Sequence, residues 1–570
     1  MKNSEIADIF YEIANLLEIK GIEFKPAAYK RAAQNITQLQ DDLNEIHKKE
    51  ALKEISGVGE SIAAKIKEIL ETGKLQYLED LRKEFPTGVL ELVKIGGIGP
   101  KIALKLSKDY GIKSVEELEN AAKEGRIRKI KGFGPKKEEN ILRSIEVFKA
   151  AKGTFLLGEI LPLAKTLESK IKELSVVSKI NVAGSIRRKK ETVRDIYIIV
   201  TSKEPDKIIN FFTKLPIVNE ILAEGETKCS VVLNNKIQVD LRIVDEDSYG
   251  SALQYFTGSK EHNIELRELA KKRNWKLNEY GLYDNTNNSK IAGKEEAEIY
   301  KALGMDFIEP ELRENSGEIE SALKRTLPNL INFNDVKGDL HMHTTWSDGS
   351  NSIEEMALAS KKLCYEYIAI CDHSAALKVA GGLSEEDILK QIKEIERLNR
   401  KLEDFTILSG IELNIDSKGY LDVNNTILKD LDFVIASVHS GFKQDEQVLT
   451  NRVLSAMSND YVNAIGHPTG RLINRRPSYK IDIHKVFETA SELGIFLEIN
   501  AFIDRLDLSD INCKMAKEYN STFVIGTDAH NINELKFMEY GVFVAKRGWL
   551  EKENVVNALS LKDLRIKLKS

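Results

Sequence analysis

The 570-residue sequence has few cysteines and no long apolar run. No stretch of about 18 or more apolar residues exists, which excludes a membrane-spanning helix. The four cysteines (Cys229, Cys364, Cys371 and Cys513) lack C-x-x-C spacing, which argues against a disulfide framework and favours a reducing cytosol. The first ten residues lack a basic segment followed by an apolar core, so we expect a cytoplasmic protein without a secretory signal.

The remaining composition is that of a soluble globular protein, with 42% hydrophobic and 30% charged residues. A chain of this length is expected to fold as several domains. The net charge of −5 does not by itself favour a nucleic-acid partner, but four local clusters are basic. These clusters are Lys25–Arg31, Arg126–Lys137, Arg187–Lys190 and Arg471–Arg476. For any one of them, a solvated surface and a DNA-binding surface are equally good interpretations.

Residues 1–150 are predicted to form short helices separated by glycine turns. Three turns have a glycine, an apolar residue and a second glycine, at Gly57–Gly59, Gly97–Gly99 and Gly132–Gly134. In the first two, Ala63 and Ala103 stand four residues after the second glycine. This pattern resembles the helix-hairpin-helix element, in which bare amides at a helix N-terminus hold a DNA phosphate without reading a base. Ordinary helix packing is the alternative, and the third turn, with Glu138 at the alanine position, is the weakest match.

Residues 151–315 are predicted to form a mixed α+β region. Strand patterns begin near Ile180 and recur at Asp195–Val200, Cys229–Leu233 and Ile237–Val244, and helical patterns lie at Phe155–Leu174 and Asp206–Leu215. After residue 250 the pattern is helical again, with a short strand region near Trp275–Leu282. A polar stretch, Glu311–Glu318, then leads to a linking helix that we expect to end near Ile331.

From Asp335 onward, seven short apolar runs recur, and each of them ends in potential metal ligands. The runs end at residues 343, 373, 412, 439, 467, 500 and 530. Amphipathic segments such as Glu385–Leu402 and Lys485–Leu493 lie between them. Strand–helix alternation with polar residues at the strand ends is typical of a β/α barrel, whose active sites form at that face. We therefore predict a seven-stranded (β/α) barrel.

Six of the nine histidines and three carboxylates belong to this region of strand ends. His341 and His343 are two residues apart on a strand, so their imidazoles point to the same side. One such histidine would more often be a core residue, but six at one barrel end predict a multi-metal centre. The candidate metal ligands are His341, His343, Asp348, His373, Glu412, His439, His467, Asp528 and His530.

With these nine positions filled, residues 336–570 resemble a PHP (polymerase and histidinol phosphatase) domain. The resemblance implies three divalent ions. Their ligands would be His341, His343, Glu412 and Asp528; Asp348, His373 and His530; and Glu412, His439 and His467, with Glu412 bridging. Imidazole and carboxylate ligands suit Mn²⁺ or Zn²⁺, between which the sequence does not choose. Clustered cations favour phosphate-ester hydrolysis, with the first ligand group as catalytic residues.

The segment V-A-G-S-I-R-R-K-K-E-T-V-R-D-I at 182–196 resembles the palm signature of family X DNA polymerases. Segments 239–242 and 252–264 add further matches, and the order with a C-terminal PHP domain is that of bacterial and archaeal members. The resemblance covers nearly the whole chain. It implies that a nucleotide triphosphate is held by Gly184, Ser185 and Arg188, and that the sugar-selecting wall is formed by Tyr255, Phe256 and Gly258.

One position departs from this family in a way that matters chemically. The family places three aspartates around two Mg²⁺ ions, two of them as D-x-D, but here the strand reads Asp195-Ile196-Tyr197. Asp240 supplies the third carboxylate. A neutral phenol cannot bridge two cations near pH 7. We therefore predict that Asp195 and Asp240 are residual, that the palm binds Mg²⁺ or Mn²⁺ weakly if at all, and that templated synthesis is lost or very weak.

Three further residues are candidates for DNA contacts. By the resemblance, Lys65 aligns with a lysine that forms a Schiff base at abasic sugar ends in some relatives, and Lys25 with a 5′-phosphate contact. For Lys65, a surface lysine is the simpler interpretation. Arg471, just past His467, could hold a neighbouring phosphate or lie in a solvated loop.

The predicted organisation has six segments in chain order. They are a helical DNA-binding domain (1–85), a helix-hairpin-helix region (86–150), a palm (151–248), a nucleotide-binding subdomain (249–318), a linker (319–335) and the PHP domain (336–570). The fold class is multidomain α+β and α/β.

The leading functional hypothesis is a monomeric DNA-repair nuclease that acts 3′→5′ on gapped DNA or 3′ ends, with incision at abasic sites as a second activity of the same centre. One alternative is a working Mn²⁺-dependent gap-filling polymerase, which also binds dNTPs, with a proofreading PHP domain. The other is a small-molecule phosphatase fused to a DNA-binding module. None of these hypotheses involves a membrane partner.

Overall fold

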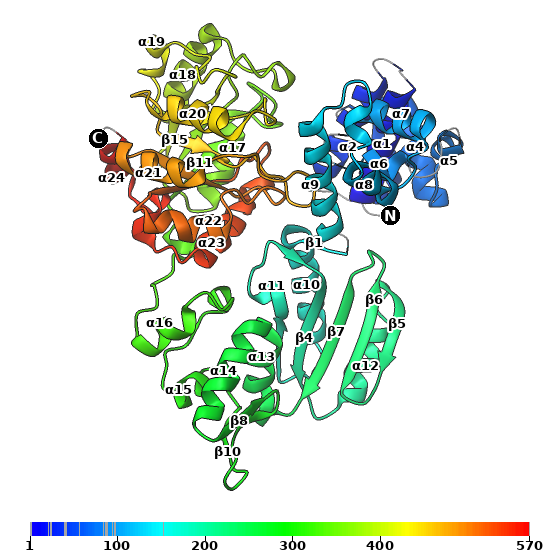
Figure 1. Cartoon of the computed structure of the whole chain (residues 1–570), viewed down its shortest axis with the longest axis vertical. Coiled ribbons are helices and arrows are strands. Elements are labelled where there is room, and N and C mark those ends of the chain that lie inside the picture. Colours follow the sequence, from blue (N-terminus) through cyan, green and yellow to red (C-terminus); the bar gives the residue numbers. More distant parts are fainter. Residues whose placement is uncertain are drawn as a thin grey trace. The chain divides into compact units, whose positions relative to one another are not determined.

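In the computed structural model the chain divides into two compact units, Met1–Lys152 with Asn474–Pro477, and Gly153–Ile473 with Ser478–Ser570 (Figure 1). The structure describes residues 3–20, 22, 25–38, 43–55, 57–83, 85, 89–93, 95, 98–151 and 153–568. Gly97, a predicted DNA contact, lies outside these residues. Across the described part of the chain, no helix combines the length and apolar character needed to cross a membrane.

The first unit is helical, and no strand occurs among its described residues. Its helices are α1 (Asn3–Ile19), α2 (Lys25–Gln38), α3 (Leu43–Lys48), α4 (Glu60–Thr72), α5 (Gln76–Lys83), α6 (Val89–Val93), α7 (Pro100–Tyr110), α8 (Val115–Lys123) and α9 (Pro135–Ala151). Helices α4 and α7 begin directly after Gly59 and Gly99. Ala63 and Ala103 are buried in the apolar core, which explains the small residues at these positions.

The palm is a five-stranded sheet in the order β2-β4-β7-β6-β5. Its strands are β2 (Lys179–Ala183), β4 (Asp195–Thr201), β5 (Val218–Glu224), β6 (Lys228–Leu233) and β7 (Gln238–Val244), and β1 (Phe155–Leu156) pairs separately with β3 (Thr192–Val193). Its helices are α10 (Leu157–Lys172), α11 (Gly184–Arg187) and α12 (Pro205–Thr213). The sequence missed the edge strand β5, because its side chains are mostly exposed and follow no alternation.

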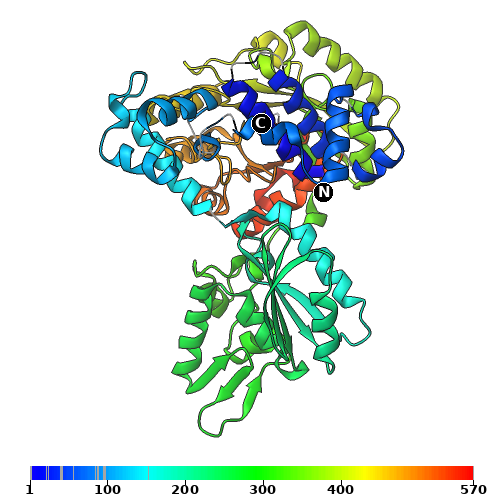
Figure 2. The same cartoon turned by 90° about the vertical axis from the view of Figure 1, so that its right-hand side faces the viewer.

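The predicted nucleotide-binding subdomain, named the thumb from here on, comprises α13 (Tyr249–Thr257), α14 (Lys260–Lys272), β8 (Trp275–Asn278), β9 (Gly281–Asp284), β10 (Lys290–Ala292), α15 (Glu296–Ala302) and α16 (Glu318–Lys324). The three-stranded sheet β10-β9-β8 of the thumb is separate from the five-stranded palm sheet (Figure 2). The linking helix predicted to end near Ile331 ends at Lys324 instead. Ile319 and Ala322 are buried in the thumb core, so the start of the predicted linker packs as part of the thumb.

The C-terminal part of the second unit, coloured from yellow-green to red in Figure 1, is the predicted barrel. Its seven parallel strands pair in the order β11 to β17. The strands are β11 (Gly338–Met342), β12 (Tyr367–Ile370), β13 (Thr406–Asn414), β14 (Phe433–Ser437), β15 (Ala464–Gly466), β16 (Phe496–Asn500) and β17 (Phe523–Gly526). The helices are α17 (Ile353–Lys362), α18 (Glu385–Asn399), α19 (Asn425–Leu428), α20 (Glu446–Met457), α21 (Ile483–Leu493), α22 (Asp510–Glu518), α23 (Met538–Arg547) and α24 (Leu561–Leu568).

Two backbone hydrogen bonds connect the first barrel strand to the segment after the last. The amide of Asp528 donates to the His341 carbonyl at 2.9 Å, and the amide of His343 donates to the Ala529 carbonyl at 2.8 Å. These bonds bring both ends of the sheet together and leave the barrel nearly closed. The carboxyl ends of all seven strands therefore face one common space.

Candidate metal centre

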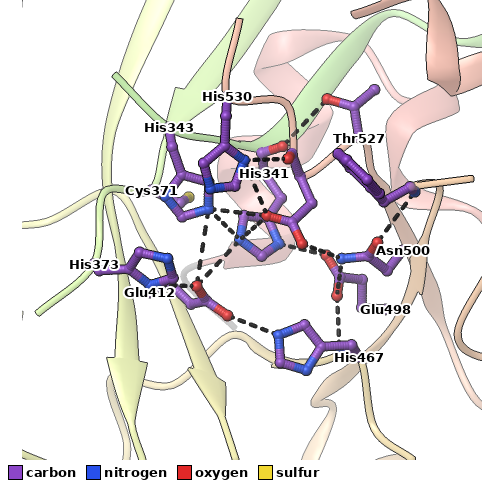
Figure 3. A network of polar contacts seen from close by, with 12 residues as sticks. His341, His343, Cys371, His373, Glu412, His467, Glu498, Asn500, Thr527 and His530 are labelled. Atoms are coloured by element: carbon purple, nitrogen blue, oxygen red, sulfur yellow. Dashed lines mark hydrogen bonds and ion pairs between the residues drawn. The ribbon is translucent and has the colours of Figure 1, made fainter. Parts of the chain in front are cut away.

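The nine candidate ligands lie at the carboxyl end of the barrel or in the loops that follow its strands. His341 and Glu412 lie on β11 and β13, and the other seven follow β11, β12, β14, β15 and β17. Glu412 lies at the middle of the cluster (Figure 3). The nine residues are separated by up to 189 positions in the chain, and only the closure of the barrel brings them together.

The two carboxylate oxygens of Glu412 face different histidines. Oε1 lies 3.0 Å from His467 Nε2 and 3.2 Å from His439 Nε2. Oε2 lies 2.8 Å from His373 Nδ1, 3.7 Å from His341 Nε2 and 3.8 Å from His343 Nε2. A carboxylate whose two oxygens face two ligand groups has the geometry of a bridging ligand.

The remaining carboxylates complete the groups on the other side of the cluster. His343 Nε2 lies 3.1 Å from Asp528 Oδ1. Asp348 Oδ1 lies 3.4 Å from His530 Nε2, and Asp348 Oδ2 lies 3.7 Å from His373 Nε2. All nine predicted ligands thus lie in one cluster.

Three sets of side chains place their ligand atoms within 4.8 Å of one another. They are His343, Asp348, His373 and His530; His341, His343 and Asp528; and His373, Glu412 and His439. These sets differ from the predicted grouping, since His343 and His373 each belong to two of them. Among the predicted ligands, His467 forms its ion pair with Glu412, and its ring packs edge to face against His439 with centroids 5.4 Å apart. The predicted assignment of each ligand to a particular ion stays a prediction.

Several buried polar atoms of this cluster lack a hydrogen-bond partner among the described residues. They include Glu412 Oε2 and the Nδ1 atoms of His343, His373, His439 and His467. His373 Nδ1 and Glu412 Oε2 lie 2.8 Å apart but are not aligned as a hydrogen bond. Buried polar atoms are normally paired, and an imidazole nitrogen and a carboxylate oxygen facing one space suit a shared cation. The residues present therefore fit a divalent-metal centre.

The imidazoles of the centre do not titrate independently. Burial opposes protonation of His341, but the nearby carboxylates, Glu498 above all, outweigh it and raise the His341 pKa well above its usual range. Burial, together with the neighbouring His530 and His373, lowers the pKa of His343 to about 4. Adjacent imidazoles thus have opposite protonation preferences, which follows from the charges packed around each.

Two residues that the sequence interpretation did not assign support the centre from β16. Glu498 Oε1 lies 2.5 Å from His341 Nδ1, and its Oε2 accepts a hydrogen bond from the His467 amide at 2.5 Å (Figure 3). Asn500 Nδ2 donates to Asp528 Oδ2 at 3.0 Å. A carboxylate on Nδ1 leaves His341 Nε2 free to face the cluster. The strand pattern L-E-I-N could have predicted both residues, because Glu498 and Asn500 are two apart on the strand and face the same side.

A third unassigned residue, the carboxylate Asp372, organises the loop that carries Asp348. It accepts hydrogen bonds from the Thr344 amide at 2.8 Å, the Thr344 hydroxyl at 2.6 Å and the Ser347 hydroxyl at 2.5 Å. The side chain of Gln391 also donates to it at 2.7 Å. Asp372 is fully buried, so its role is to hold the loop after β11 in one conformation.

Arg471 occupies a different environment from the one predicted. Its Nη1 and Nη2 lie 3.2 and 2.6 Å from the two carboxylate oxygens of Glu191 in the palm, and Nη2 also donates to the Leu506 carbonyl. The side chain is only 15% exposed. A DNA phosphate would have to displace this internal ion pair, so the structure does not favour Arg471 as a phosphate contact.

In the palm, Tyr197 pairs with Asp240 in register between the parallel strands β4 and β7. The Tyr197 ring stacks on Phe256, with centroids 5.9 Å apart and an interplanar angle of 27°. Burial, reinforced by Asp195 and Asp240, raises the Tyr197 pKa above its usual value, so the phenol is neutral at pH 7. Asp240 accepts hydrogen bonds from Ser230 and from Gln238, the latter at 2.8 Å. The position at which the sequence resemblance predicts a bridging carboxylate thus holds an aromatic ring.

The predicted nucleotide contacts lie beside this ring, but the predicted triphosphate contact Arg188 is bonded to other residues of the protein. Gly184 has φ +68°, and a Cβ built on it would lie 3.0 Å from Tyr197 Cδ2, so the ring packs on the turn that contains Ser185. Arg188 Nε lies 2.9 Å from Glu314 Oε1, and its Nη1 donates to the Thr257 carbonyl next to Gly258.

Two residues of the predicted sugar-selecting wall contact each other. Tyr255 and Phe256 pack edge to face with centroids 5.1 Å apart. Their roles toward a nucleotide stay predictions, as do those of Gly184, Ser185, Arg188 and Gly258.

The helix-hairpin-helix turns expose the features that the sequence indicated. Gly57 has φ +74°, a conformation that favours glycine. Gly59 and Gly99 are exposed N-cap residues, and no side chain among the described residues caps the amides of α4 or α7. In the third turn, Glu138 is buried and accepts a hydrogen bond from the Arg128 amide at 2.8 Å, so it has a structural role.

The lysines predicted to contact DNA lie near these turns. Lys25 is exposed at the start of α2. Lys65 Nζ donates to the Ser61 hydroxyl at 3.0 Å and lies 5.0 Å from the centre of the Tyr77 ring. Burial lowers the Lys65 pKa, although Glu68 opposes this shift. The DNA contacts of both lysines stay predictions.

Comparison with known proteins places this arrangement in a family. The DNA polymerase/3'-5' exonuclease PolX of Bacillus subtilis is 40% identical over 572 residues, covering 100% of both chains. The chain belongs to the family X DNA polymerases with a C-terminal PHP domain.

Separate family models match the parts of this family X chain. A helix-hairpin-helix domain matches residues 1–75, a SAM-like helix-hairpin-helix tandem 89–146, a DNA polymerase beta thumb 252–314 and a PHP domain 339–502. A probable phosphatase of Thermoanaerobacter sp. is 35% identical over 230 residues, which are 38% of this chain and 89% of that protein. A probable phosphatase of Acetivibrio thermocellus is 35% identical over 202 residues, which are 34% of this chain and 78% of that protein.

Proposed function

We propose that this family X protein is a DNA-repair nuclease whose PHP centre hydrolyses DNA phosphodiesters, chiefly 3′→5′ from an end. The carrying observation is that the barrel cluster has all nine predicted ligands, whereas the palm has Tyr197 where the bridging carboxylate belongs. The name of the Bacillus subtilis relative, which includes a 3'-5' exonuclease, agrees with this assignment.

The proposed centre takes three divalent ions, Mn²⁺ or Zn²⁺, with Glu412 as the bridging ligand. Such ions would polarise the phosphate and make water a stronger nucleophile. Glu498 orients His341, and Asp372 orders the loop of Asp348. The chain thereby presents ligands held by buried hydrogen bonds, which reduces the reorganisation needed when substrate binds.

The polymerase-like half and the helix-hairpin-helix turns would position gapped or frayed DNA through sequence-independent phosphate contacts. The uncapped amides after Gly59 and Gly99 are suited to this role, because a helix N-terminus attracts an anion. Incision at abasic sites is a second activity that we propose for the same metal centre.

The test uses the purified full chain, a 5′-labelled primer on gapped template and Mn²⁺, with and without dNTPs. Primer shortening in both reactions supports the nuclease. The double variant His341→Ala, His343→Ala should abolish shortening and retain DNA binding. Shortening that persists in this variant would contradict the assignment to the barrel.

A gap-filling polymerase with a proofreading PHP domain is the second candidate, because the relative's name also includes a DNA polymerase. It requires primer extension in the dNTP reaction, and that extension should collapse in Asp195→Ala or Asp240→Ala. The engagement of Arg188 by Glu314 and the ring of Tyr197 disfavour it.

A small-molecule phosphatase is the third candidate, because the PHP region resembles proteins named probable phosphatases. It predicts turnover of a phosphomonoester without hydrolysis of a 3′-labelled oligonucleotide. Both substrates should therefore be compared at equal protein and Mn²⁺ concentration.

A further inference from the structure

The loop Ala501–Leu508, between β16 and α22, carries a cation to the edge of the metal centre. Arg505 Nε lies 3.5 Å from Asp528 Oδ2, and the Arg505 side chain is 24% exposed. The Arg505 amide donates to the Phe502 carbonyl at 2.9 Å, which fixes the turn. Nη1 and Nη2 of Arg505 make no hydrogen bond to any other residue in the described part of the chain.

The position of Arg505 beside the metal centre is unusual once the charge of bound metal ions is considered. The ligand set contains three carboxylates, Asp348, Glu412 and Asp528, and the buried Glu498 adds a fourth. Three divalent ions would bring six positive charges, which exceed these four. Asp504 and Asp507 of the same loop also attract Arg505, but bound divalent ions would repel it, so a further anion at the centre would be stabilised there. In a phosphoesterase, that anion is the substrate phosphate, for which a guanidinium is well suited.

The palm holds the loop on both sides of Arg505. Ile503 packs against the backbone of α10, because a Cβ built on Gly158 would lie 2.4 Å from Ile503 Cγ2. On the other side, the Leu506 carbonyl accepts a hydrogen bond from Arg471, which is paired with Glu191 at 2.6 Å. Both Gly158 and Glu191 lie outside the barrel.

We propose that Arg505 binds a non-bridging phosphate oxygen of DNA at the metal centre, and that Glu191 acts through Arg471 as a positioning residue for the Arg505 loop. This inference rests on the proposed phosphodiester hydrolysis. It also gives the polymerase-like half a role in the nuclease that does not need nucleotide synthesis.

The first test compares Arg505→Ala and Arg505→Lys with Arg400→Ala, a surface arginine on the side of the barrel that is 77% exposed. We expect Arg505→Ala to lower kcat/KM for DNA about 10- to 100-fold, the range for losing a charge-assisted hydrogen bond. Mn²⁺ binding by calorimetry should stay within about twofold, and Arg505→Lys should recover part of the loss. Free guanidinium should partly rescue Arg505→Ala.

A second readout separates this proposal from the nuclease assignment. Binding of inorganic phosphate to the Mn²⁺-loaded protein should weaken about 10-fold in Arg505→Ala and not in Arg400→Ala. If the wild type hydrolyses no DNA, the nuclease proposal fails, and phosphate binding still tests Arg505. Unchanged phosphate binding in Arg505→Ala would overturn the proposed role of Arg505. An equally large loss of Mn²⁺ affinity would also overturn it, because Arg505 would then act only by holding the metal ligand Asp528.

The palm contact is tested with Glu191→Ala, Arg471→Ala and their double variant, with the exposed palm residue Glu220 changed to alanine as control. We expect each single change to lower kcat/KM and phosphate binding while leaving Mn²⁺ binding nearly unchanged, and to lower the Tm because the other charge of the pair is left without its partner. The double variant should be no worse than the singles, because both act through one contact. Additive losses, or a loss confined to Tm, would contradict a positioning role.

Discussion

Tyr197 and Asp240 face each other in register on the parallel strands β4 and β7, and the Tyr197 ring stacks on Phe256. The phenol therefore stands beside the residual carboxylate where a bridging ligand would be needed. Because burial and the two nearby aspartates raise the Tyr197 pKa, ionisation near neutral pH cannot supply the missing charge.

We expect wild-type protein to extend a primer weakly or not at all, and Tyr197→Asp to gain detectable Mn²⁺-dependent incorporation. Tyr197→Phe, which also removes the hydroxyl but adds no carboxylate, is the control. Primer extension should be measured in the His341→Ala, His343→Ala background, so that degradation does not hide synthesis. If Tyr197→Asp stays inactive, the missing carboxylate is not the only defect of the palm.

Glu498→Gln should weaken Mn²⁺ binding about 10- to 100-fold, because the carboxylate orients His341 and favours its Nδ1–H form. Calorimetry measures the affinity directly. Glu366→Gln is a matched control, since Glu366 is exposed and pairs only with Lys337 at 3.3 Å among the described ion pairs. An affinity within twofold of wild type would show that Glu498 does not tune the ligand.

The thumb should be sensitive to acid through Glu296. Burial alone would raise the Glu296 pKa, but Arg313 and Arg187 outweigh burial and lower it to about 2. A carboxylate with a depressed folded-state pKa stabilises the fold above its unfolded pKa, and this stabilisation is lost as pH falls toward the folded pKa. From pH 6 to pH 3 the loss from this group is about 2 kcal/mol.

Chemical denaturation at several pH values measures this effect. Glu296→Gln should be less stable than wild type at pH 6, because it leaves buried arginines unpaired, and its stability should fall less between pH 6 and pH 3. If the free energy of unfolding falls equally with pH in the two proteins, Glu296 is not a source of the acid sensitivity.

DNA binding by the first unit should depend on the bare helix N-termini. Gly59→Asp places a negative charge at the α4 amides, so we expect DNA affinity to fall about 10-fold and its salt dependence to become shallower. Ser114→Asp is the control, because Ser114 already caps α8 through the Glu117 amide and the charge change is equal. Fluorescence anisotropy over a range of salt concentrations would measure the DNA affinity of both variants. Equal losses of affinity would indicate general repulsion between the added charge and DNA, not a contact at the α4 N-terminus.

Much of the architecture followed from local patterns. Apolar runs ending in polar residues predicted all seven barrel strands, because strand length and the position of the strand end are local properties. The glycine turns likewise marked the starts of α4 and α7. The edge strand β5 and the end of α16 at Lys324 were missed, because exposure and packing against the thumb core are not local.

The sequence by itself determined which residue types reach the carboxyl end of the barrel, from His341 to His530, and that Tyr197 stands where the family resemblance predicts a carboxylate in the palm. Only the tertiary structure decided which interactions these residues make. It turned the two oxygens of Glu412 toward different histidines and paired Arg471 with Glu191, 280 residues away. It also brought Arg505 to Asp528. Such pairings depend on barrel closure and on burial, which change the free energy of a charge far more than its sequence neighbours do.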